Sequence, residues 1–411
     1  MIEKYYNGVI EQVAGGIGNV EHNSILVRYS NDFSIWDLES VNHYKDQTDI
    51  FFTCHEFSYN KIAEAYEPYL GLIRQMFHKY CSGTLEEFME ECDVYKLQRP
   101  VFESYFEKGF CERTEQILID EVEYEQERMR NSIVTMLQKL SEIRPVVIVL
   151  NRFQLASKST MQLSNSLLQV KNKNIGIVLG VNDVQSIPEF AHEEWDAICE
   201  SMDDRNMVYH IGNAGRNMEP DVMDYYSDYE SDDGYRKLNN LVYFLDFDQA
   251  DHHLSKIERR IKFDNFTISE KKHYQLLLLQ IMVSVLQRDI AKALESCEDL
   301  EKLQDQEKEG AFYYNFWMAT SYMYLGKLEE AMIYVQKAKE CGEALGDDFL
   351  VFRAELLKAQ NQMSGWCNIF FCAQDIEISD KLIEKLNAYH YKNHLAHIYI
   401  YAYDNKPEIV A

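Results

Sequence analysis

The sequence is poor in residues that interrupt helices and in basic residues. Its 411 residues include only 6 prolines and 17 glycines, and such scarcity favours a largely helical chain. Lys and Arg number 41 against 68 Asp and Glu, which gives a net charge of −27. Nucleic acids and anionic membrane surfaces both attract basic proteins, so we expect neither as a partner.

The cysteine pattern lacks the spacing of a metal or disulfide framework. Nine cysteines are present, an odd number, and no two of them have C-x-x-C spacing. This excludes zinc-finger spacing and a fully paired disulfide set. No run of about 18 apolar residues is present, and the first residues lack the apolar core of a signal peptide. We therefore expect a soluble cytoplasmic protein.

Continuous apolar runs predict a parallel β-sheet in the first half of the chain. The runs at residues 146–150 and 175–181 are separated by a helix-length segment, a pattern typical of a βαβ unit that is buried on both faces. A second such unit covers residues 24–54. Five strands are predicted in all, at residues 24–29, 50–54, 146–150, 175–181 and 207–211.

Length and local composition predict the domain organisation. A chain of 411 residues with 46% hydrophobic content is expected to form two or three packed domains. Residues 212–236 are rich in acidic residues and tyrosine and poor in aliphatics, which is typical of a linker or loop. We expect an α/β domain at residues 1–211 with a helical insert at 60–140, then the acidic linker, then an all-α domain at 237–411.

A repeat pattern is visible in the predicted all-α domain. Small and aromatic residues stand at Ala319, Tyr322, Gly326, Ala331 and Ala338. Tetratricopeptide repeats have this spacing, because small residues let two antiparallel helices approach closely. Ala293 lies 38 residues before Ala331, close to the ideal period of about 34. Residues 349–366 and 380–403 are predicted to add helix pairs to this superhelical domain, with an ordinary helical bundle as the alternative.

Helical repeats bind proteins on extended surfaces, so we expect a protein partner here. The candidate contact residues are Trp317, Tyr322, Tyr324, Tyr391 and Asn393. His390 and His394 lie four residues apart and could share a metal on one helix face. A structural role in a tyrosine-rich segment is the more frequent use of such histidines.

Residues 145–170, PVVIVLNRFQLASKSTMQLSNSLLQV, resemble a motif of the signal-transduction ATPases with numerous domains. This STAND class includes the MalT-like bacterial regulators. Its second motif has an apolar strand, two acids, an aromatic residue or leucine, a glutamine and a helix. Phe153 and Gln154 keep this order, and Asn182 matches the position that senses the γ-phosphate. The resemblance implies a P-loop NTPase-like α/β parallel sheet followed by tetratricopeptide-like helices, with an output domain or partner beyond residue 411.

The residues that hold phosphate and Mg²⁺ in that class are missing. No G-x-x-x-x-G-K-[ST] loop occurs anywhere in the sequence, although its backbone, lysine and hydroxyl bind the phosphates and Mg²⁺. Asn151 and Arg152 replace the two acids, and an amide lacks the negative charge that Mg²⁺ prefers. The degenerate nucleotide positions are Asn31, Asp32, Ser34, Asn151, Arg152 and Asn182.

Two further anion-binding candidates carry less weight. Gly15, Gly16 and Gly18 form a glycine cluster, but no convincing strand precedes it, and such clusters are more often turns. Arg152 could bind an anion from a strand tip, but a surface or inter-domain salt bridge is the preferred interpretation.

The leading hypothesis from the sequence is a regulatory or scaffolding protein without catalysis and without a cofactor. Its helical repeats would bind a protein in an intracellular signalling pathway. The first alternative is an ATP-binding STAND-type switch or ATPase with an unconventional phosphate loop, which would use ATP and Mg²⁺. The second is a plain repeat scaffold whose N-terminal half has another α/β fold.

Overall fold

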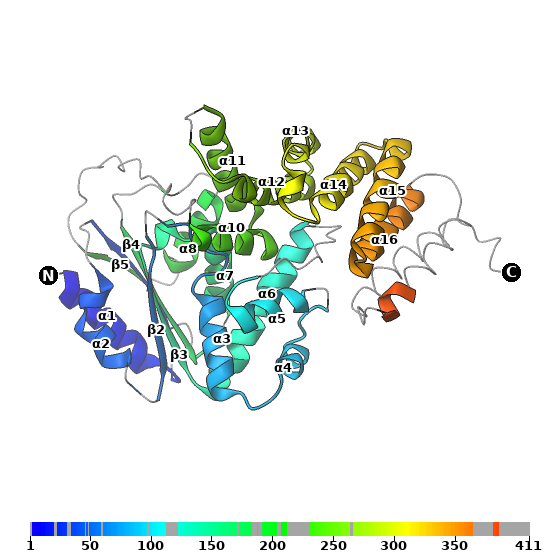
Figure 1. Ribbon diagram of the computed structural model, residues 1–411. Coiled ribbons are helices and arrows are strands. Elements are labelled where there is room, and N and C mark those ends of the chain that lie inside the picture. Colours follow the sequence, from blue (N-terminus) through cyan, green and yellow to red (C-terminus); the bar gives the residue numbers. More distant parts are fainter. Residues whose placement is uncertain are drawn as a thin grey trace. The chain divides into compact units, whose positions relative to one another are not determined.

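A computed structural model shows two compact units, Met1–Ala250 and Asp251–Ala411. The residues it describes are 2–19, 23–30, 34–45, 47, 49–58, 61–96, 98–111, 122–170, 172–182, 187, 191–203, 207–211, 231–263, 266–364 and 381–385. The first unit contains a parallel sheet with helices, and the second unit is mostly helical (Figure 1). The predicted α/β half and helical half are therefore both confirmed.

The sheet has five parallel strands in the order β2-β3-β4-β1-β5. Their bounds are β1 Ser24–Tyr29, β2 Phe51–Glu56, β3 Val146–Asn151, β4 Ile175–Asn182 and β5 Val208–Ile211. Strands β3 and β4 are buried along their whole length, as expected for central parallel strands covered on both faces. Each predicted strand is present, and the largest difference is β2, which begins at residue 51 and continues to residue 56.

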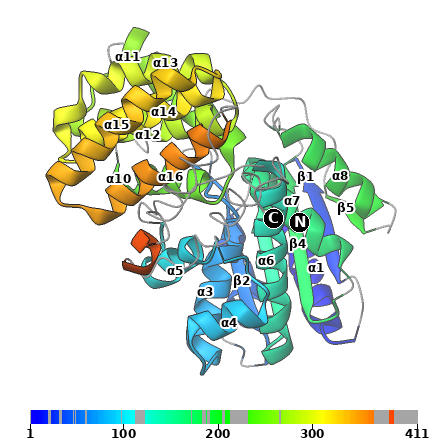
Figure 2. The same ribbon diagram turned by 90° about the vertical axis from the view of Figure 1, so that its right-hand side faces the viewer.

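Helices cover both faces of the sheet (Figures 1 and 2). On one face lie α1 (Ile2–Gly16), η1 (Ile35–Asp37) and α2 (Glu39–Lys45), whose apolar side chains share a core with β1, Val147, Val149 and Val178. On the other face lie α3 (Tyr69–Tyr80), α6 (Val122–Ile143) and α7 (Lys158–Gln169). Helix α8 (His192–Asp203) packs on α7, whereas α4 (Leu85–Glu91) and α5 (Arg99–Lys108) pack on α3, where Phe88 and Phe106 contact Phe77. Helices α3 to α6 account for the predicted insert at residues 60–140.

The glycine cluster near the N-terminus ends a helix. Gly15 and Gly16 belong to the last turn of α1, and Gly18 follows with φ 82°. The Gly18 N–H donates to the carbonyl of Lys173 at 2.7 Å, just before the start of β4. The cluster precedes β1 and lies at the amino-terminal edge of the strands, so it cannot serve as a loop at their carboxyl ends.

Helix α10 (Asp232–Tyr243) belongs to the first unit. Asn239 Nδ2 donates to the carbonyl of Cys111, and the Phe244 ring after the helix packs on the rings of Phe102 and Tyr105. The first unit consequently extends to Ala250, later than the predicted domain start at residue 237. Residues 212–230 of the predicted linker lie outside the described residues.

The second unit is a succession of helices. Their bounds are α11 Phe247–Phe263, which begins in the first unit, α12 Glu270–Leu286, α13 Ile290–Glu301, α14 Gly310–Tyr324, α15 Leu328–Leu345 and α16 Asp348–Ser364. From α12 to α16 each helix packs on the next one along the chain (Figure 2). The predicted segment 349–366 corresponds to α16, and of segment 380–403 only residues 381–385 are described.

Three helix corners share one backbone geometry. Each has a residue in the left-handed region: Leu245 (φ 67°), Arg288 (φ 66°) and Gly326 (φ 71°). The next residue donates its N–H to the carbonyl five positions earlier, at 2.8 to 2.9 Å, which closes the end of the preceding helix. A fully buried alanine follows five residues after each left-handed residue: Ala250, Ala293 and Ala331. The small side chain lets the second helix of each corner pack closely.

Candidate functional site

The carboxyl ends of the five parallel strands meet at one edge of the sheet. After β1 the chain passes to β2 at the far side of the sheet, whereas after β4 it passes to β5 on the opposite side of β1. The adjacent strands β1 and β4 therefore lead to connections that diverge, which is a topological switch point. In open α/β sheets, ligands bind outside the strand ends at such a point.

Asn151, the last residue of β3, is fully buried at this edge. Its Oδ1 accepts a hydrogen bond from the Tyr29 hydroxyl at 2.8 Å, whereas no described residue accepts one from its Nδ2. Gly180 lies beside it on β4, where a Cβ would be 2.7 Å from Asn151 Oδ1 and would overlap the Tyr6 hydroxyl. The Tyr6 and Tyr29 side chains therefore occupy the space next to the amide, and only a residue without a Cβ fits at position 180.

Arg152 follows Asn151 in a left-handed conformation, with φ 53° and ψ 42°. Its Nη1 lies 3.3 Å from Glu56 Oε1, and the two side chains are 20% and 9% exposed. The predicted salt bridge therefore exists, but it is neither on the surface nor between domains. It joins the ends of the neighbouring strands β2 and β3 inside the first unit.

The Glu56 carboxylate also contacts the segment that follows β1. Its Oε2 accepts from Ser34 Oγ at 3.4 Å and from the Ile35 N–H at 3.3 Å. Ser34 Oγ in turn caps η1 by accepting from the Trp36 N–H. One internal carboxylate therefore takes a hydroxyl, a backbone N–H and a guanidinium, the same donor types that bind a phosphate group.

Asn182 ends β4 beside Tyr29, its partner in the sheet register. Its backbone N–H donates to Gln154 Oε1 at 3.2 Å, and both residues are buried. The structure therefore brings Ser34, Asn151, Arg152 and Asn182 to one edge of the sheet. Asn31 and Asp32 lie outside the described residues.

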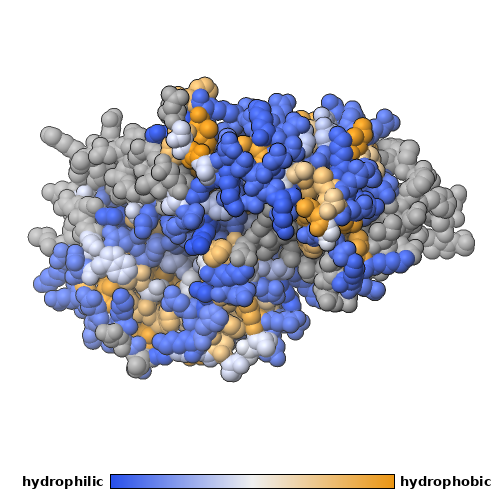
Figure 3. Space-filling model, in the orientation of Figure 1, coloured by the Kyte–Doolittle hydropathy of each residue, from blue (hydrophilic) through white to orange (hydrophobic). Residues whose placement is uncertain are grey.

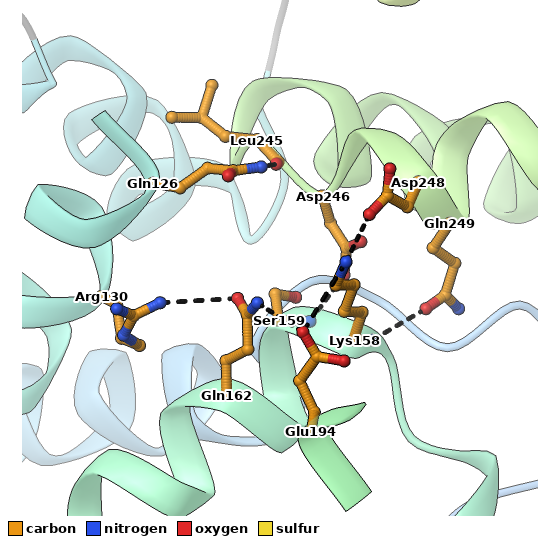
Figure 4. A network of polar contacts seen from close by, with 10 residues as sticks. All are labelled: Gln126, Arg130, Lys158, Ser159, Gln162, Glu194, Leu245, Asp246, Asp248 and Gln249. Carbon is orange, nitrogen blue, oxygen red and sulfur yellow. Dashed lines mark hydrogen bonds and ion pairs between the residues drawn. The ribbon is translucent and has the colours of Figure 1, made fainter. Parts of the chain in front are cut away.

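A polar network connects the N-terminal turn of α7 with the corner between α10 and α11 (Figure 4). At the N-terminus of α7, the Ser159 N–H donates to Asp246 Oδ2 at 2.9 Å and the Lys158 N–H to Gln249 Oε1 at 3.2 Å. The Lys158 ammonium lies 2.5 Å from Asp248 and 3.6 Å from Glu194. Asp246 and Gln249 are each 4% exposed. Residues from the corner thus satisfy helix N–H groups that would otherwise lack acceptors.

The sequence did not point to several residues that shape this edge. Glu56 was missed because the predicted strand ended at Cys54, although an acid at the end of a parallel strand is a usable signal. Tyr6 and Tyr29 were missed because a tyrosine in an apolar run looks like ordinary core. Burial raises the pKa of Tyr6 well above its usual value, with Tyr29 as the next cause.

The candidate partner-binding residues of the helical unit differ in exposure. Trp317 is 5% exposed and belongs to the core, so it offers little surface to a partner. The Tyr322 ring stacks on Tyr334 with centroids 5.5 Å apart, and the Arg288 guanidinium lies 4.0 Å from the Tyr324 ring centroid. Tyr391, Asn393, His390 and His394 lie outside the described residues.

The described part of the chain lacks two kinds of feature. No described helix is long and apolar enough to cross a membrane. Among the same residues, no group of three or more His, Cys, Asp or Glu side chains could hold a metal ion. Comparisons with family models, with curated proteins and with solved structures find no match to this chain.

Proposed function

We propose that this chain is a non-catalytic regulatory or scaffolding protein that combines a degenerate P-loop-like α/β module with tetratricopeptide-like helices. The observation that carries the proposal is the position of Glu56. Its carboxylate takes Ser34 Oγ, the Ile35 N–H and Arg152, the donors nearest to the place where a phosphate loop would follow β1. A nucleotide phosphate would have to displace this carboxylate.

The tip of β3 also fits a nucleotide–Mg²⁺ complex poorly. Asn151 is uncharged, fully buried and hydrogen-bonded to Tyr29, whereas Mg²⁺ is normally bound through carboxylates and phosphate oxygens. The residues at the edge of the sheet are therefore poorly suited to bind the ATP and Mg²⁺ that the STAND resemblance implies.

A titration with ATP and Mg²⁺ tests the non-catalytic part of the proposal. A Kd above about 1 mM would stabilise the full chain by at most about 0.4 kcal/mol at 1 mM ligand. We expect ATP and Mg²⁺ to stabilise the chain by no more than this amount in a thermal-shift measurement, and we expect no release of phosphate. Stabilisation by about 2.7 kcal/mol would correspond to a Kd about a hundredfold below the ligand concentration and would instead support the ATP-binding switch.

The repeated corners support the scaffolding part of the proposal. A residue in the left-handed region, followed five positions later by a buried alanine, recurs at 288–293 and 326–331. Repeat proteins build an extended binding surface by stacking such recurring units. Leu325 and Ile333 in this region are 46% and 56% exposed. The face seen in Figure 3 is mostly hydrophilic, with separate hydrophobic patches.

Paired substitutions test whether the helical unit binds a protein. Once a partner is identified by cross-linking to the full chain, Leu325→Ser with Ile333→Ser should weaken its binding and leave the melting temperature nearly unchanged, since both side chains are exposed. Tyr5→Ser is the matched control, because Tyr5 is 60% exposed but belongs to the first unit. Equal binding by the unmodified chain, the double variant and the Tyr5→Ser control would exclude this surface.

A further inference from the structure

Strand β2 forms one edge of the sheet and is paired on one side, with β3. The Phe51 N–H donates to the carbonyl of Pro145, and a parallel ladder uses every second residue of a strand. The odd-numbered residues of β2 therefore bond to β3, whereas the N–H and C=O groups of Phe52 and Cys54 point away from it. In the part of the chain that the structure describes, no backbone hydrogen bond reaches these outward groups.

The edge of β2 lacks the features that usually protect an open strand. Proteins shield such edges with lysine, proline, a bulge or a very short strand. β2 has six residues, all half-buried, contains no proline or lysine, and keeps a continuous register with β3. Its first four side chains are uncharged, and burial lowers the pKa of His55 to about 4, so the fifth is neutral at pH 7. Such an edge favours pairing with another strand.

Helices flank this edge on both faces of the sheet (Figure 1). On one face α2 packs on β2, and the Tyr44 ring stacks on the Phe52 ring with centroids 5.8 Å apart. On the other face Tyr80, the last residue of α3, has its ring centroid 6.1 Å from that of Phe51. The Lys79 ammonium lies 5.9 Å from the Phe51 ring centroid. A partner that pairs with β2 would therefore also meet these two helices.

The outward groups of β2 are complementary to those of a second β2. In an antiparallel pair about a two-fold axis at Thr53, Phe52 lies opposite Cys54 of the copy. Phe51 then lies opposite His55 of the copy. Each of the two Phe52–Cys54 pairs exchanges two backbone hydrogen bonds, and no like charges face each other across these pairs. One surface thus serves both copies, as a two-fold interface requires.

The charges on the α3 face fit this pairing. Lys79 is exposed, and no ion pair joins it to another described residue. Glu67 Oε1 lies 3.4 Å from His55 Nε2, and the Glu67 side chain is a quarter exposed. Phe51 and His55 point to the same face of the sheet. Since Phe51 lies opposite His55 of the copy, Lys79 of each copy approaches Glu67 of the other.

The charges on the α2 face fit it as well. Asp37 and Glu39 are exposed at the start of α2, and Lys45 is exposed at its end. Among the helices on this face, α2 is the one that packs on the edge strand. A two-fold axis reverses α2 relative to its copy, so the acidic start of one helix faces the basic end of the other.

We propose that two copies of this chain associate through their β2 edges, so that the sheet continues from one copy into the other. Backbone hydrogen bonds at Phe52 and Cys54 hold the strands together, and the charges on both faces fix their antiparallel direction. Each copy carries a net charge of −27, which opposes their approach. Salt at about 0.2 M weakens this long-range repulsion, because the Debye length is then below about 8 Å. This inference does not depend on the proposed function.

Sedimentation velocity of the full chain at about 0.2 M salt measures the association. We expect the dimer to predominate at a chain concentration of about 100 µM, which corresponds to a Kd of about 100 µM or less. The melting temperature of each variant shows whether it folds.

A proline on the edge strand tests the backbone pairing. Cys54→Pro removes an outward N–H and no bond to β3, and proline is tolerated where the N–H of an edge strand faces solvent. It should raise the dimer Kd at least about tenfold, since each copy loses a hydrogen bond. Cys54→Ala keeps the N–H and is the matched control, so its Kd should stay close to that of the unmodified chain.

A charge reversal tests the same interface without a change in the strand. Lys79→Glu places a carboxylate near Glu67 of the copy and should raise the dimer Kd about fivefold or more. Lys139→Glu changes the net charge equally at an exposed position on α6, and its effect on the Kd should be smaller.

A cross-link tests the register of the two strands. Residue 53 lies opposite itself in a non-hydrogen-bonded pair, where the Cα atoms are about 4.5 Å apart, within the range of a disulfide. In the Cys54→Ala background, Thr53→Cys should therefore form an intermolecular disulfide when diamide oxidises the two thiols. Peptide mass spectrometry identifies the link between the two copies of residue 53.

Three results would overturn the proposal. The first is an unmodified chain that stays monomeric at the stated concentration. The second is a folded Cys54→Pro variant that dimerises as tightly as Cys54→Ala. The third applies if Cys54→Pro does not fold: equal dissociation constants for Lys79→Glu and Lys139→Glu, without a cross-link at residue 53, show that the copies do not meet at β2.

Discussion

The carboxylate of Glu56 lies 3.3 Å from the guanidinium of Arg152, across the ends of two neighbouring strands. The same carboxylate holds Ser34 and the Ile35 N–H, which belong to the segment after β1. Three connections of the sheet are thereby joined at one carboxylate. Because the pair is largely buried, the loss of either charge leaves the other without its partner.

Replacement of Glu56 by glutamine should destabilise the chain. The amide keeps an acceptor for Ser34 and Ile35, but Arg152 loses its counter-charge, so we expect a loss of about 1–3 kcal/mol. Urea unfolding of the full chain measures it. Glu39→Gln, an exposed position at the start of α2, should change stability by less than about 0.5 kcal/mol. Equal effects of the two variants would contradict the assigned role of Glu56.

Restoration of an acid at the tip of β3 should not restore a Mg²⁺ site. In Asn151→Asp an ionised carboxylate would be fully buried beside Tyr29, and we expect a loss of about 2–4 kcal/mol at pH 8. The loss should shrink at lower pH, where the new acid is neutral. Asn131→Asp, at an exposed position on α6, is the control. Stabilisation of Asn151→Asp by added Mg²⁺ would count against a degenerate site.

Removal of the Asp246 carboxylate should loosen the first turn of α7. Asp246→Ala leaves the Ser159 N–H without its acceptor, which costs about 1–2 kcal/mol. Asp246→Asn keeps an acceptor and should cost less. Hydrogen exchange of a peptide that contains Ser159 is the direct measurement. Asp248→Ala removes a more exposed ion pair and should cost less than about 1 kcal/mol. Faster hydrogen exchange at Ser159 in Asp248→Ala but not in Asp246→Ala would contradict the role assigned to Asp246.

The corner glycine Gly326 should resist substitution for conformational reasons alone. A Cβ at Gly326 meets nothing within 4 Å, but its φ is 71°, so Gly326→Ala should cost about 1 kcal/mol. Gly8 in α1 also has open space around a Cβ, and Gly8→Ala should stabilise by about 0.5–1 kcal/mol. Thermal melting shows whether each substitution stabilises or destabilises the chain. A stabilising Gly326→Ala would refute the left-handed corner.

His253 should make the chain less stable in mild acid. Burial, with the neighbouring His252 and Lys256 charges, lowers the pKa of His253 from 6.5 to about 3. Between these values the unfolded chain binds a proton that the folded chain does not, so the stability that is present above pH 6.5 falls as the pH falls. At pH 5 the loss is about 2 kcal/mol.

The comparison of two histidine variants isolates this effect. His253→Gln should flatten the dependence of unfolding free energy on pH between about 6.5 and about 4. His43→Gln, at an exposed position on α2, should keep the slope of the unmodified chain. If both variants retain that slope, other groups are responsible for the acid sensitivity.

The strands were predictable because buried parallel strands require continuous apolar runs. Their order was not, since β4 pairs with both β3 and β1 through backbone hydrogen bonds, and the apolar side chains of these strands look alike in sequence. The role of Glu56 was hidden for a similar reason. Its partners Ser34 and Arg152 lie far away along the chain, and only the sheet brings them together.

The helix corners show a different limit. Gly326 was predicted as a turn because glycine favours the left-handed region. Leu245 and Arg288 adopt nearly the same φ without that signal. Ala250 and Ala293, each five residues later, are fully buried, and we infer that the packing of the second helix outweighs the local preference of the corner residue.

The hydrogen bond between Tyr29 and Asn151 joins a hydroxyl to an amide. Neither group needs a counter-ion. We therefore expect the Asn151 side chain at the end of β3 to keep one position once the sheet has folded. We expect it to remain the same when the supply of divalent cations or the ratio of nucleoside triphosphate to diphosphate changes, so this edge would act as a constant support and not as a gauge of cellular energy.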